Sequence, residues 1–313
     1  MTRQPSEDGS WLSYAGVSGD LSVVASADGP VVVKRALPRL RTVADWRSDP
    51  SRSSVEARCL SLLADLLEPG CVPRVLWVDE ARHCFAMEKL PDELIPWKAR
   101  LLACEVDDAT AARVGAVLGQ MHARTHGRAD IAADFDDRRF LFELRIRPFH
   151  ERVAQRHPDL ASAIQQVVHD MLVDRRCLVH GDYSPKNLLT RASRVVVLDC
   201  EVAHWGDPRF DIGFCLGHLL LKIVRGGCPA DLAAAAKVFL SAYAAEGLPV
   251  FDARLAQATG CVVMARIDGD SPVDYLEPPA RRAAAFALGR RLLLDPPADP
   301  WTCVGHALDV ATP

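Results

Sequence analysis

The sequence of 313 residues predicts an α+β fold with two lobes, a small β-rich lobe followed by a larger, mainly helical one. Two observations lead to this prediction. Up to about Met87 the apolar residues come in short runs separated by turn residues, which is typical of strands and hairpins. Beyond residue 98 they recur at helical spacing over long stretches. We therefore expect an N-terminal lobe over residues 1–87, a hinge over 88–97 and a C-terminal lobe over 98–313.

The predicted N-terminal lobe is mostly strands. The segment from Trp11 to Lys34, WLSYAGVSGDLSVVASADGPVVVK, has the pattern of three strands separated by turns. Asp28 and Gly29 between two apolar runs favour a hairpin. Two further strands are expected at residues 75–79 and 84–88, which would complete a small sheet.

Three helices are expected from the spacing of apolar residues, at residues 54–67, 109–126 and 159–173. Ser53 or Ser54 is the expected N-cap of the first, with Glu56 in its first turn. The last hundred residues are also expected to be mainly helical, without internal repeats. The second lobe is therefore predicted to be a helical body, and a ligand-binding cleft is expected between the two lobes.

The composition is that of an ordinary globular protein, with 49% apolar and 25% charged residues. The net charge of −4, from 37 basic and 41 acidic residues, favours neither nucleic acid nor an anionic membrane as a partner. No apolar stretch approaches the roughly 20 residues that span a bilayer. The first ten residues, MTRQPSEDGS, do not have the pattern of a signal or transit peptide, so we expect a cytoplasmic protein. The sequence does not indicate an oligomeric state.

Ten cysteines are scattered along the chain, and none forms a CxxC pair. Most have apolar neighbours, as in FCLGHLL and GCVVMA. We therefore expect them to be small buried side chains and not a metal site or a disulfide framework.

The most specific signal is the segment LVHGDYSPKNLL at residues 178–189, followed by the apolar run VVVLD. Asn187, the only asparagine of the chain, comes five residues after Asp182, and Asp199 ends the apolar run. Phosphoryl transfer needs a carboxylate near the acceptor hydroxyl, and an amide oxygen and a second carboxylate to hold Mg²⁺. We therefore expect Asp182 to be the catalytic base, and Asn187 and Asp199 to be metal ligands.

Three further residues are candidates for supporting roles, namely Glu201 beside the metal ligands, and His180 and Asp211 as structural support of the loop that contains Asp182. Glu201 lies two residues after Asp199, so on an extended segment both side chains share a face. It could bind the metal or the substrate, or be a solvated carboxylate at a strand end. Asp211 is expected to be structural, either capping a helix or accepting hydrogen bonds from the loop backbone near His180.

Lys34 ends the apolar strand VVVK, where an unpaired ammonium group would be costly. Glu56, at the start of the following helix, is its expected partner, with nucleotide phosphates on the other side. The turn YAGVSGD, with Gly16, Ser18 and Gly19, is a candidate for covering those phosphates, although it lacks a full GxGxxG motif.

Several other charged residues have more than one possible role or are expected to be structural. Lys186 is either a substrate contact or an exposed loop charge, and Asp207 is expected to be a turn residue. Arg145 and Arg147 in LRIRPFH are expected on a salt-bridged surface. Arg266, Asp268 and Asp270 in MARIDGDSP lie near one predicted loop and are candidates for the substrate end of the cleft.

These motifs resemble those of the aminoglycoside phosphotransferase and choline kinase superfamily, which has a protein-kinase-like fold. LVHGDYSPKNLL is similar to its catalytic loop, and VVVLDCEVAHWGDPRFDIGF to its metal-binding strand and the helix start that follows. ATAARVGAVLGQMHARTH resembles the helix that begins the large lobe. FAMEKLP resembles the hinge, which implies that the backbone of Glu88, Lys89 and Leu90 meets adenine.

The resemblance implies an ATP- and Mg²⁺-dependent kinase that phosphorylates a hydroxyl of a small molecule, either an antibiotic or a metabolite. Ser184 stands where protein kinases have a lysine, and no APE-like segment follows DCE, so a peptide acceptor is not expected. Choline or ethanolamine, or a sugar similar to methylthioribose, remain alternative acceptors. The rival from another class is a pseudokinase that binds nucleotide without transferring phosphate.

Overall fold

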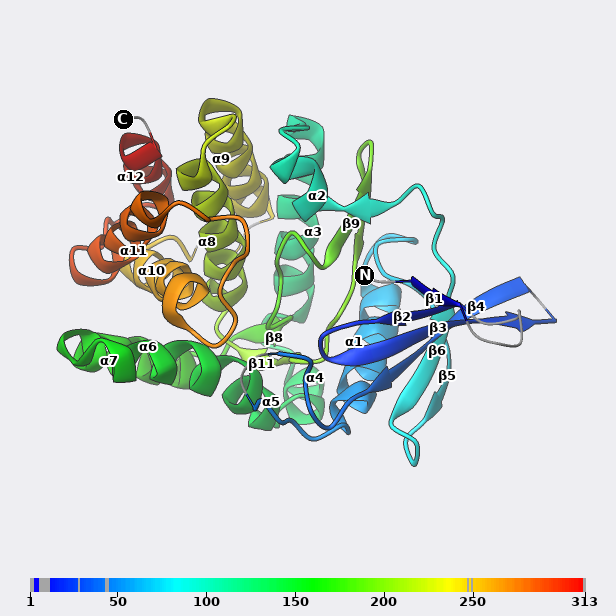
Figure 1. The fold of residues 1–313 in the computed structure, drawn as a ribbon. Helices are drawn as coiled ribbons and strands as arrows, with labels where there is room; N and C mark the ends of the chain where they lie inside the picture. Colours follow the sequence, from blue (N-terminus) through cyan, green and yellow to red (C-terminus); the bar gives the residue numbers. More distant parts are fainter. Residues whose placement is uncertain are drawn as a thin grey trace.

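The computed structural model describes residues 3–5, 12–27, 29–42, 45–246, 248 and 250–311, and it confirms the two-part α+β architecture (Figure 1). One six-stranded antiparallel sheet, in the order β1-β2-β3-β4-β6-β5, forms the N-terminal part. Its strands are β1 Arg3–Pro5, β2 Leu12–Ala15, β3 Gly19–Ser26, β4 Gly29–Ala36, β5 Val75–Asp79 and β6 Cys84–Glu88. β3 and β4 pair up to Ser26 opposite Gly29. Trp11 and Asp28, which belong to the predicted strand and hairpin, lie outside the described residues.

Helix α1, Arg52–Leu66, packs against β4, β5 and β6. It begins two residues earlier than expected, and its N-cap is Ser51, so the prediction of Ser53 or Ser54 is wrong. The reason is local, because the Asp49 carboxylate accepts a hydrogen bond of 2.9 Å from the Ser51 N–H and starts the turn there. This register places the Glu56 side chain, which is 2% exposed, against the sheet.

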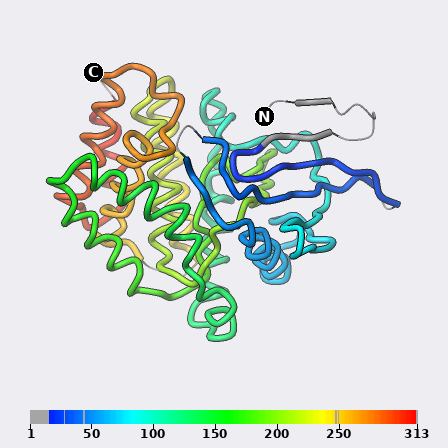
Figure 2. Tube along the Cα trace, turned by 60° about the horizontal axis from the view of Figure 1, so that its bottom comes forward, coloured from blue at the N-terminus to red at the C-terminus, as the bar shows by residue number. Residues whose placement is uncertain are grey.

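The C-terminal part is mainly helical, as predicted. In the turned view of Figure 2 the N-terminal strands and the last helices again lie at opposite sides of the molecule. The helices of the C-terminal part are α2 Trp97–Leu102, α3 Asp108–Thr125, α4 Ala129–Asp134, α5 Arg139–Leu141, a π-helix Phe142–Glu151, α6 Arg152–Arg156, a 3₁₀ helix Pro158–Leu160, α7 Ala161–Val173, α8 Arg209–Arg225, α9 Pro229–Ala245, α10 Ala253–Asp268, α11 Pro279–Leu294 and α12 Pro300–Ala311. α8 is the central helix and is buried from Arg209 to Val224. Within the described ranges, no helix is both long and apolar enough to cross a membrane.

Five short strands hold two loops between the sheet and the helices. They are β7 Ile95–Pro96, β8 Cys177–Val179, β9 Leu188–Arg191, β10 Arg194–Val197 and β11 His204–Gly206. β9 and β10 form a hairpin that also pairs with β7, and β11 pairs with β8. One loop, residues 180–187, joins β8 to β9, and the other, residues 198–203, joins β10 to β11. Strand pairing therefore holds the two candidate-site segments near each other.

The cysteines depart from expectation at one place. Cys104, after α2, and Cys228, before α9, are joined by a disulfide across a separation of 124 residues. The other eight are buried thiols, as expected. The prediction against disulfides is therefore wrong for this pair, because residues so far apart in sequence become neighbours only through the packing of the helical lobe.

Candidate functional site

The loop from His180 to Asn187 is held in shape by backbone and ring contacts. Gly181 has a φ of 80°, and a Cβ there would come within 2.6 Å of the Val202 carbonyl, so this position requires glycine. The Asp182 N–H donates to His180 Nδ1 at 3.1 Å. His180 Nε2 lies 2.9 Å from the Leu198 carbonyl and donates to it, which ties the two loops together.

Asp211, in the first turn of α8, anchors the same loop from below. Its buried carboxylate accepts the N–H groups of His180 at 2.7 Å and Gly181 at 2.9 Å. It also lies 3.2 Å from His122 Nε2, and His122 Nδ1 lies 2.9 Å from the Tyr243 hydroxyl. Burial alone would raise the pKa of Asp211, but the hydrogen bond and charge of His122 outweigh it and hold the pKa below its usual value. The contact expected between Asp211 and the loop near His180 is present.

Asp182 is buried and carries two basic partners. Arg145 Nη2 lies 3.0 Å and Lys186 Nζ 2.9 Å from its Oδ2. Arg145 Nε also donates to the Gly181 carbonyl at 2.7 Å. Burial would raise the pKa of Asp182, but the charges of Arg145 and then Lys186 hold it below its usual value. The carboxylate is therefore ionised near neutral pH and available to orient a hydroxyl group.

The expectation that Arg145 lies on a salt-bridged surface is wrong, whereas Arg147 is exposed. Arg145 comes from the π-helix Phe142–Glu151, which also contains Pro148. π-helical turns are rare and frequent at functional sites, and their register does not follow the usual helical period. The available signal in the sequence was the apolar residue on each side of Arg145, Leu144 and Ile146, which are both buried in the structure.

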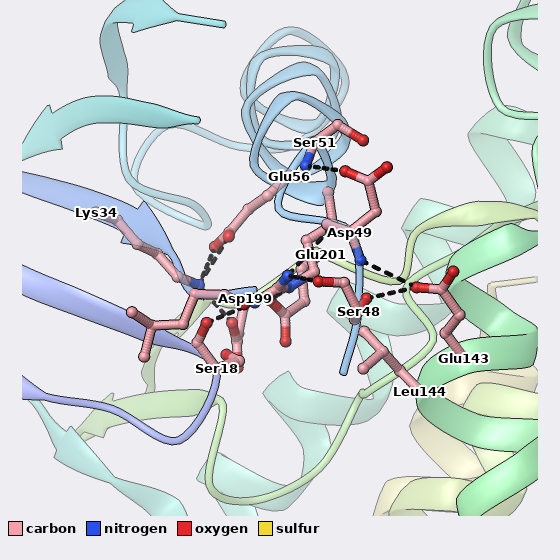
Figure 3. A network of polar contacts seen from close by, with 12 residues as sticks. Ser18, Lys34, Ser48, Asp49, Ser51, Glu56, Glu143, Leu144, Asp199 and Glu201 are labelled. Atoms are coloured by element: carbon pink, nitrogen blue, oxygen red, sulfur yellow. Dashed lines mark hydrogen bonds and ion pairs between the residues drawn. The ribbon is translucent and has the colours of Figure 1, made fainter. Parts of the chain in front are cut away.

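Lys34, at the left of Figure 3, joins the two parts of the molecule. Its ammonium lies 2.7 Å from the Glu56 carboxylate on α1 and 2.5 Å from Asp199 Oδ1 after β10. Burial would lower the pKa of Lys34, but Asp199 and Glu56 outweigh it and raise the pKa above its usual value. The pairing expected with Glu56 is present, and the contact with Asp199 adds a link between the lobes.

A group of oxygen ligands surrounds this lysine. One carboxylate oxygen each from Glu56, Asp199 and Glu201 lie within 4.8 Å of one another. Asp199 has a φ of 69°, a left-handed conformation that aspartate tolerates better than most residues. Asn187 Nδ2 donates to the Asp182 carbonyl at 2.9 Å, so the amide nitrogen is used within the loop and its oxygen is the group left for a ligand. Clustered oxygen donors are what Mg²⁺ prefers, so these residues fit that ion.

Arg52 was missed by sequence reasoning and is fully buried beneath the cluster. Its Nε lies 2.9 Å from Glu201 Oε2, and its Nη2 donates to the carbonyls of Ser18 at 2.6 Å and Leu37 at 2.8 Å. It therefore connects Glu201 to the turn before β3. The surrounding segment RSDPSRSS suggests a solvated loop, and only the α1 register points this side chain inward.

The turn between β2 and β3 contains the predicted phosphate-covering residues. The Gly16 N–H donates to the Gly19 carbonyl at 2.9 Å, and Leu37 N–H donates to the Ser18 carbonyl at 3.0 Å. A Cβ at Gly19 would come within 2.9 Å of the Arg35 carbonyl, so the turn packs closely on β4. The turn lies on the same strand pair as Lys34, since Leu21 pairs with Lys34. Its role toward a nucleotide stays a prediction.

The predicted hinge begins at the last residue of β6, Glu88, and continues with Lys89 and Leu90. Glu88 Oε1 accepts from the Arg74 N–H at 3.0 Å, and Lys89 Nζ donates to Asp92 at 2.6 Å. Leu90 is half-buried. The side chains of Glu88 and Lys89 are therefore engaged locally, and the expected adenine contact, which concerns their backbone, stays a prediction.

The structure separates the remaining candidates. Asp268 lies 2.8 Å from His157 Nε2 and Asp270 2.7 Å from Arg152 Nε, so both make contacts away from Asp182. Asp207 is more than a turn residue, because it is buried and pairs with Arg209 at 3.1 Å. Arg266, the third candidate from MARIDGDSP, places its guanidinium 5.8 Å from the centre of the Phe149 ring.

Solved structures with the same fold include an amicoumacin kinase in complex with AMP-PNP, Ca²⁺ and Ami. It superposes with a TM-score of 0.58 at 14% identity and covers 93% of this chain and 90% of that one. A choline kinase from Cryptosporidium parvum Iowa II gives a TM-score of 0.55 at 13% identity, covering 90% and 88%. These similarities confirm the fold.

Curated relatives include methylthioribose kinases. That of Pectobacterium atrosepticum is 26% identical over 219 residues, 61% of this chain and 54% of that protein. That of Bacillus cereus is 24% identical over 236 residues, 65% and 59%. The chain thus spans little more than half the length of these relatives. A family model described as the phosphotransferase enzyme family matches residues 15–248, which contain Lys34, Asp182 and Asp199. The chain belongs to this phosphotransferase (APH) family.

Proposed function

We propose that this protein is a kinase that uses ATP and Mg²⁺ to phosphorylate a hydroxyl group of a small molecule. The observation that carries this proposal is the position of Lys34, whose ammonium contacts Glu56 in one lobe and Asp199 in the other. Asp182, ionised and held between Arg145 and Lys186, lies on the adjoining loop. Family membership and the kinase names of the relatives support the same reading.

In this proposal each group has one task. Asp182 orients the acceptor hydroxyl and receives its proton while the oxygen bonds to the γ-phosphorus and the bond to the ADP oxygen breaks. Because the pKa of Asp182 is low, its main contribution is orientation, and the proton reaches it late in the step. Lys34 keeps its contact with Glu56 and would hold the α- and β-phosphates on its other side, where it now contacts Asp199. Asn187, Asp199 and Glu201 would hold Mg²⁺, which when bound would supply positive charge to neutralise the phosphates.

The nucleotide would lie between the lobes. Its adenine would meet the backbone of residues 88–90, and its phosphates would lie under the turn of Gly16, Ser18 and Gly19. Arg52 supports that turn through the Ser18 carbonyl and Glu201 at the same time, so the turn and the metal site are coupled mechanically.

The test is Mg²⁺-dependent release of ADP from ATP across a panel of hydroxyl compounds, with Asp182→Asn beside the wild type. The panel holds aminoglycosides, choline, ethanolamine, methylthioribose, other sugars and hydroxy acids. Acceleration by one class of compound in the wild type alone supports the kinase. ATP binding without ADP release for any compound would favour a pseudokinase.

Replacing Arg145 by methionine is expected to move the acid limb of the pH profile of kcat/KM to higher pH. Arg145 stabilises the ionised form of Asp182, so its removal raises the pKa of that carboxyl group and more of it is protonated at a given acidic pH. The stabilising effect of the arginine is present above the pKa of Asp182 and lost as the pH falls through it. We also expect kcat at neutral pH to fall by about 10-fold, because the carboxylate loses one of its two orienting partners.

Arg147→Met is the matched control, since the same side chain is lost two residues away at an exposed position. It should leave both the acid limb and kcat unchanged. An unchanged acid limb in Arg145→Met would show that the pair does not set the ionisation of Asp182.

A further inference from the structure

Lys222, on the central helix α8, is a buried cation without a negatively charged partner. It is 1% exposed, and its Nζ donates to the carbonyl of His218, one turn back on the same helix, at 3.1 Å. Among the residues that the structure describes, it makes no ion pair. Burial without a counter-charge disfavours the ammonium form of a lysine, and an anion bound beside it would stabilise that form.

Further hydrogen-bond donors lie near Lys222, and two of their polar atoms lack a partner. The Tyr275 ring has Lys222 Nζ 5.1 Å and Lys98 Nζ 5.5 Å from its centre. The Tyr275 hydroxyl and Arg266 Nε are both buried without a hydrogen-bond partner. Lys98 has one carboxylate contact, with the exposed Asp274 at 3.2 Å. We call Lys98, Lys222, Arg266 and Tyr275 the cationic cluster.

The cluster adjoins Asp182 through two connections. The Lys98 N–H donates to the carbonyl of Pro185, inside the catalytic loop, at 2.8 Å. Arg145, the partner of Asp182, lies 5.6 Å from the centre of the Phe149 ring, and Arg266 lies 5.8 Å from the same centre. In Figure 1 the orange segment between α10 and α11, which contains Tyr275, crosses the face of α8. The donors therefore lie on the C-terminal-lobe side of Asp182, away from Lys34.

The pKa shifts of Lys222 and His218 agree with positive groups lying close together in the cationic cluster. Burial, followed by the charge of Lys98, lowers the pKa of Lys222 to about 7. Burial and the charges of Arg266 and Lys222 hold the pKa of His218 well below its usual value. Positive groups thus repel one another here, and a bound anion would relieve that repulsion.

We propose that the phosphate acceptor is an alcohol that also carries an anionic group, a carboxylate or a phosphate, bound by Lys222, Lys98 and the Tyr275 hydroxyl. This rests on the proposed kinase function and adds the class of its acceptor. The anion supplies the counter-charge that Lys222 lacks, and the alcohol of the same molecule points to Asp182. A polycationic or quaternary ammonium acceptor would instead be repelled by the cluster.

The first experiment compares matched acceptors, namely gluconate with glucose, glycerate with glycerol, and ribose 5-phosphate with ribose. ADP release should rise for at least one anionic member and not for its neutral counterpart, and the carboxylate and phosphate pairs separate the two chemistries. Lys222→Met should raise KM for that acceptor at least about 10-fold with a smaller change in kcat. Lys237→Met, the same change at an exposed position on α9, should alter neither. Equal turnover of the neutral members would overturn the proposal.

The second experiment needs no turnover and measures the thermal midpoint of the whole chain with Mg²⁺ and AMP-PNP. Without acceptor, Lys222→Met should have a higher midpoint than the wild type, because the unpaired buried charge is gone; this also guards against a folding defect. An anionic compound should raise the midpoint of the wild type and not that of Lys222→Met. No shift with any anion, or equal shifts in both proteins, would contradict the proposal.

The two readouts keep the proposals separate. Lys222-dependent binding of anions without ADP release from any compound would remove the kinase function and leave the anion site. Asp182-dependent ADP release with neutral alcohols, and no effect of Lys222→Met, would leave the kinase and remove the anionic acceptor.

Discussion

Asp182→Asn is expected to lower kcat by about 10²–10⁴-fold, the range that a positioned acid–base group contributes. The change keeps the shape of the side chain but removes the charge that orients the acceptor hydroxyl and receives its proton. The affinity for Mg²⁺-ATP should stay within a few-fold, because Lys34 pairs with Asp199 and Glu56, not with Asp182. ADP release with a saturating acceptor gives kcat, and calorimetric titration with Mg²⁺-AMP-PNP gives the affinity.

The variant also leaves the charges of Arg145 and Lys186 without their carboxylate, so a second variant is needed. Asp182→Asn combined with Arg145→Met removes one of these unpaired charges. If kcat stays as low as in the single variant, the loss comes from the missing carboxylate. Recovery in the double variant would mean that the unpaired arginine had distorted the loop. A near-normal kcat in Asp182→Asn would remove this residue from the mechanism.

The parts of the site that could be predicted are encoded over short stretches. His180, Asp182 and Asn187 lie in one loop, and Asp199 ends the strand run that follows, so their spacing in the sequence already limits their spacing in space. Alternating apolar residues and turn signals likewise located β3 to β6 and the large helices. Lys34 and Glu56 could be paired because an apolar strand and a helix would bury both.

The parts that could not be predicted depend on partners far away in the chain. Arg52 meets Glu201 across 149 residues. Arg145 reaches the loop of residues 180–187, 36 residues away at Gly181, from a π-helix whose register does not follow the ordinary helical period. The Cys104–Cys228 disulfide closes over 124 residues. Each is set by how the lobes pack, and a polar segment such as that around Arg52 gives no sign of burial.

Lys222 is a related case. In the run LGHLLLKIV a lysine near a helix end is expected to extend toward solvent, since its long side chain allows it. The segment after α10 instead covers it through Tyr275, whose ring also contacts Lys98 of α2. Neither contact is visible in the local pattern, so the cationic cluster emerges only from the tertiary structure.

Asp211→Ala is expected to lower the free energy of unfolding by about 3–5 kcal/mol, the usual result of breaking a buried charged contact by removing one partner. The N–H groups of His180 and Gly181 would lose their acceptor while remaining buried, and His122 would lose its carboxylate. The loop that presents Asp182 would be loosened, so kcat should fall as well. Urea denaturation gives the change in stability, and ADP release gives the change in kcat.

Asp231→Ala is the control for Asp211→Ala, because it measures how much stability is lost when any acidic side chain is removed from the first turn of a helix. Asp231 lies in the first turn of α9, as Asp211 lies in the first turn of α8, but it is exposed. Losing its charge removes a favourable interaction with the helix dipole of about 0.3–1 kcal/mol. The excess loss in Asp211→Ala over Asp231→Ala therefore measures the buried contacts with the catalytic loop and His122. Equal losses in the two variants would mean that Asp211 acts only on its own helix, and that β8 and β11 hold the catalytic loop without it.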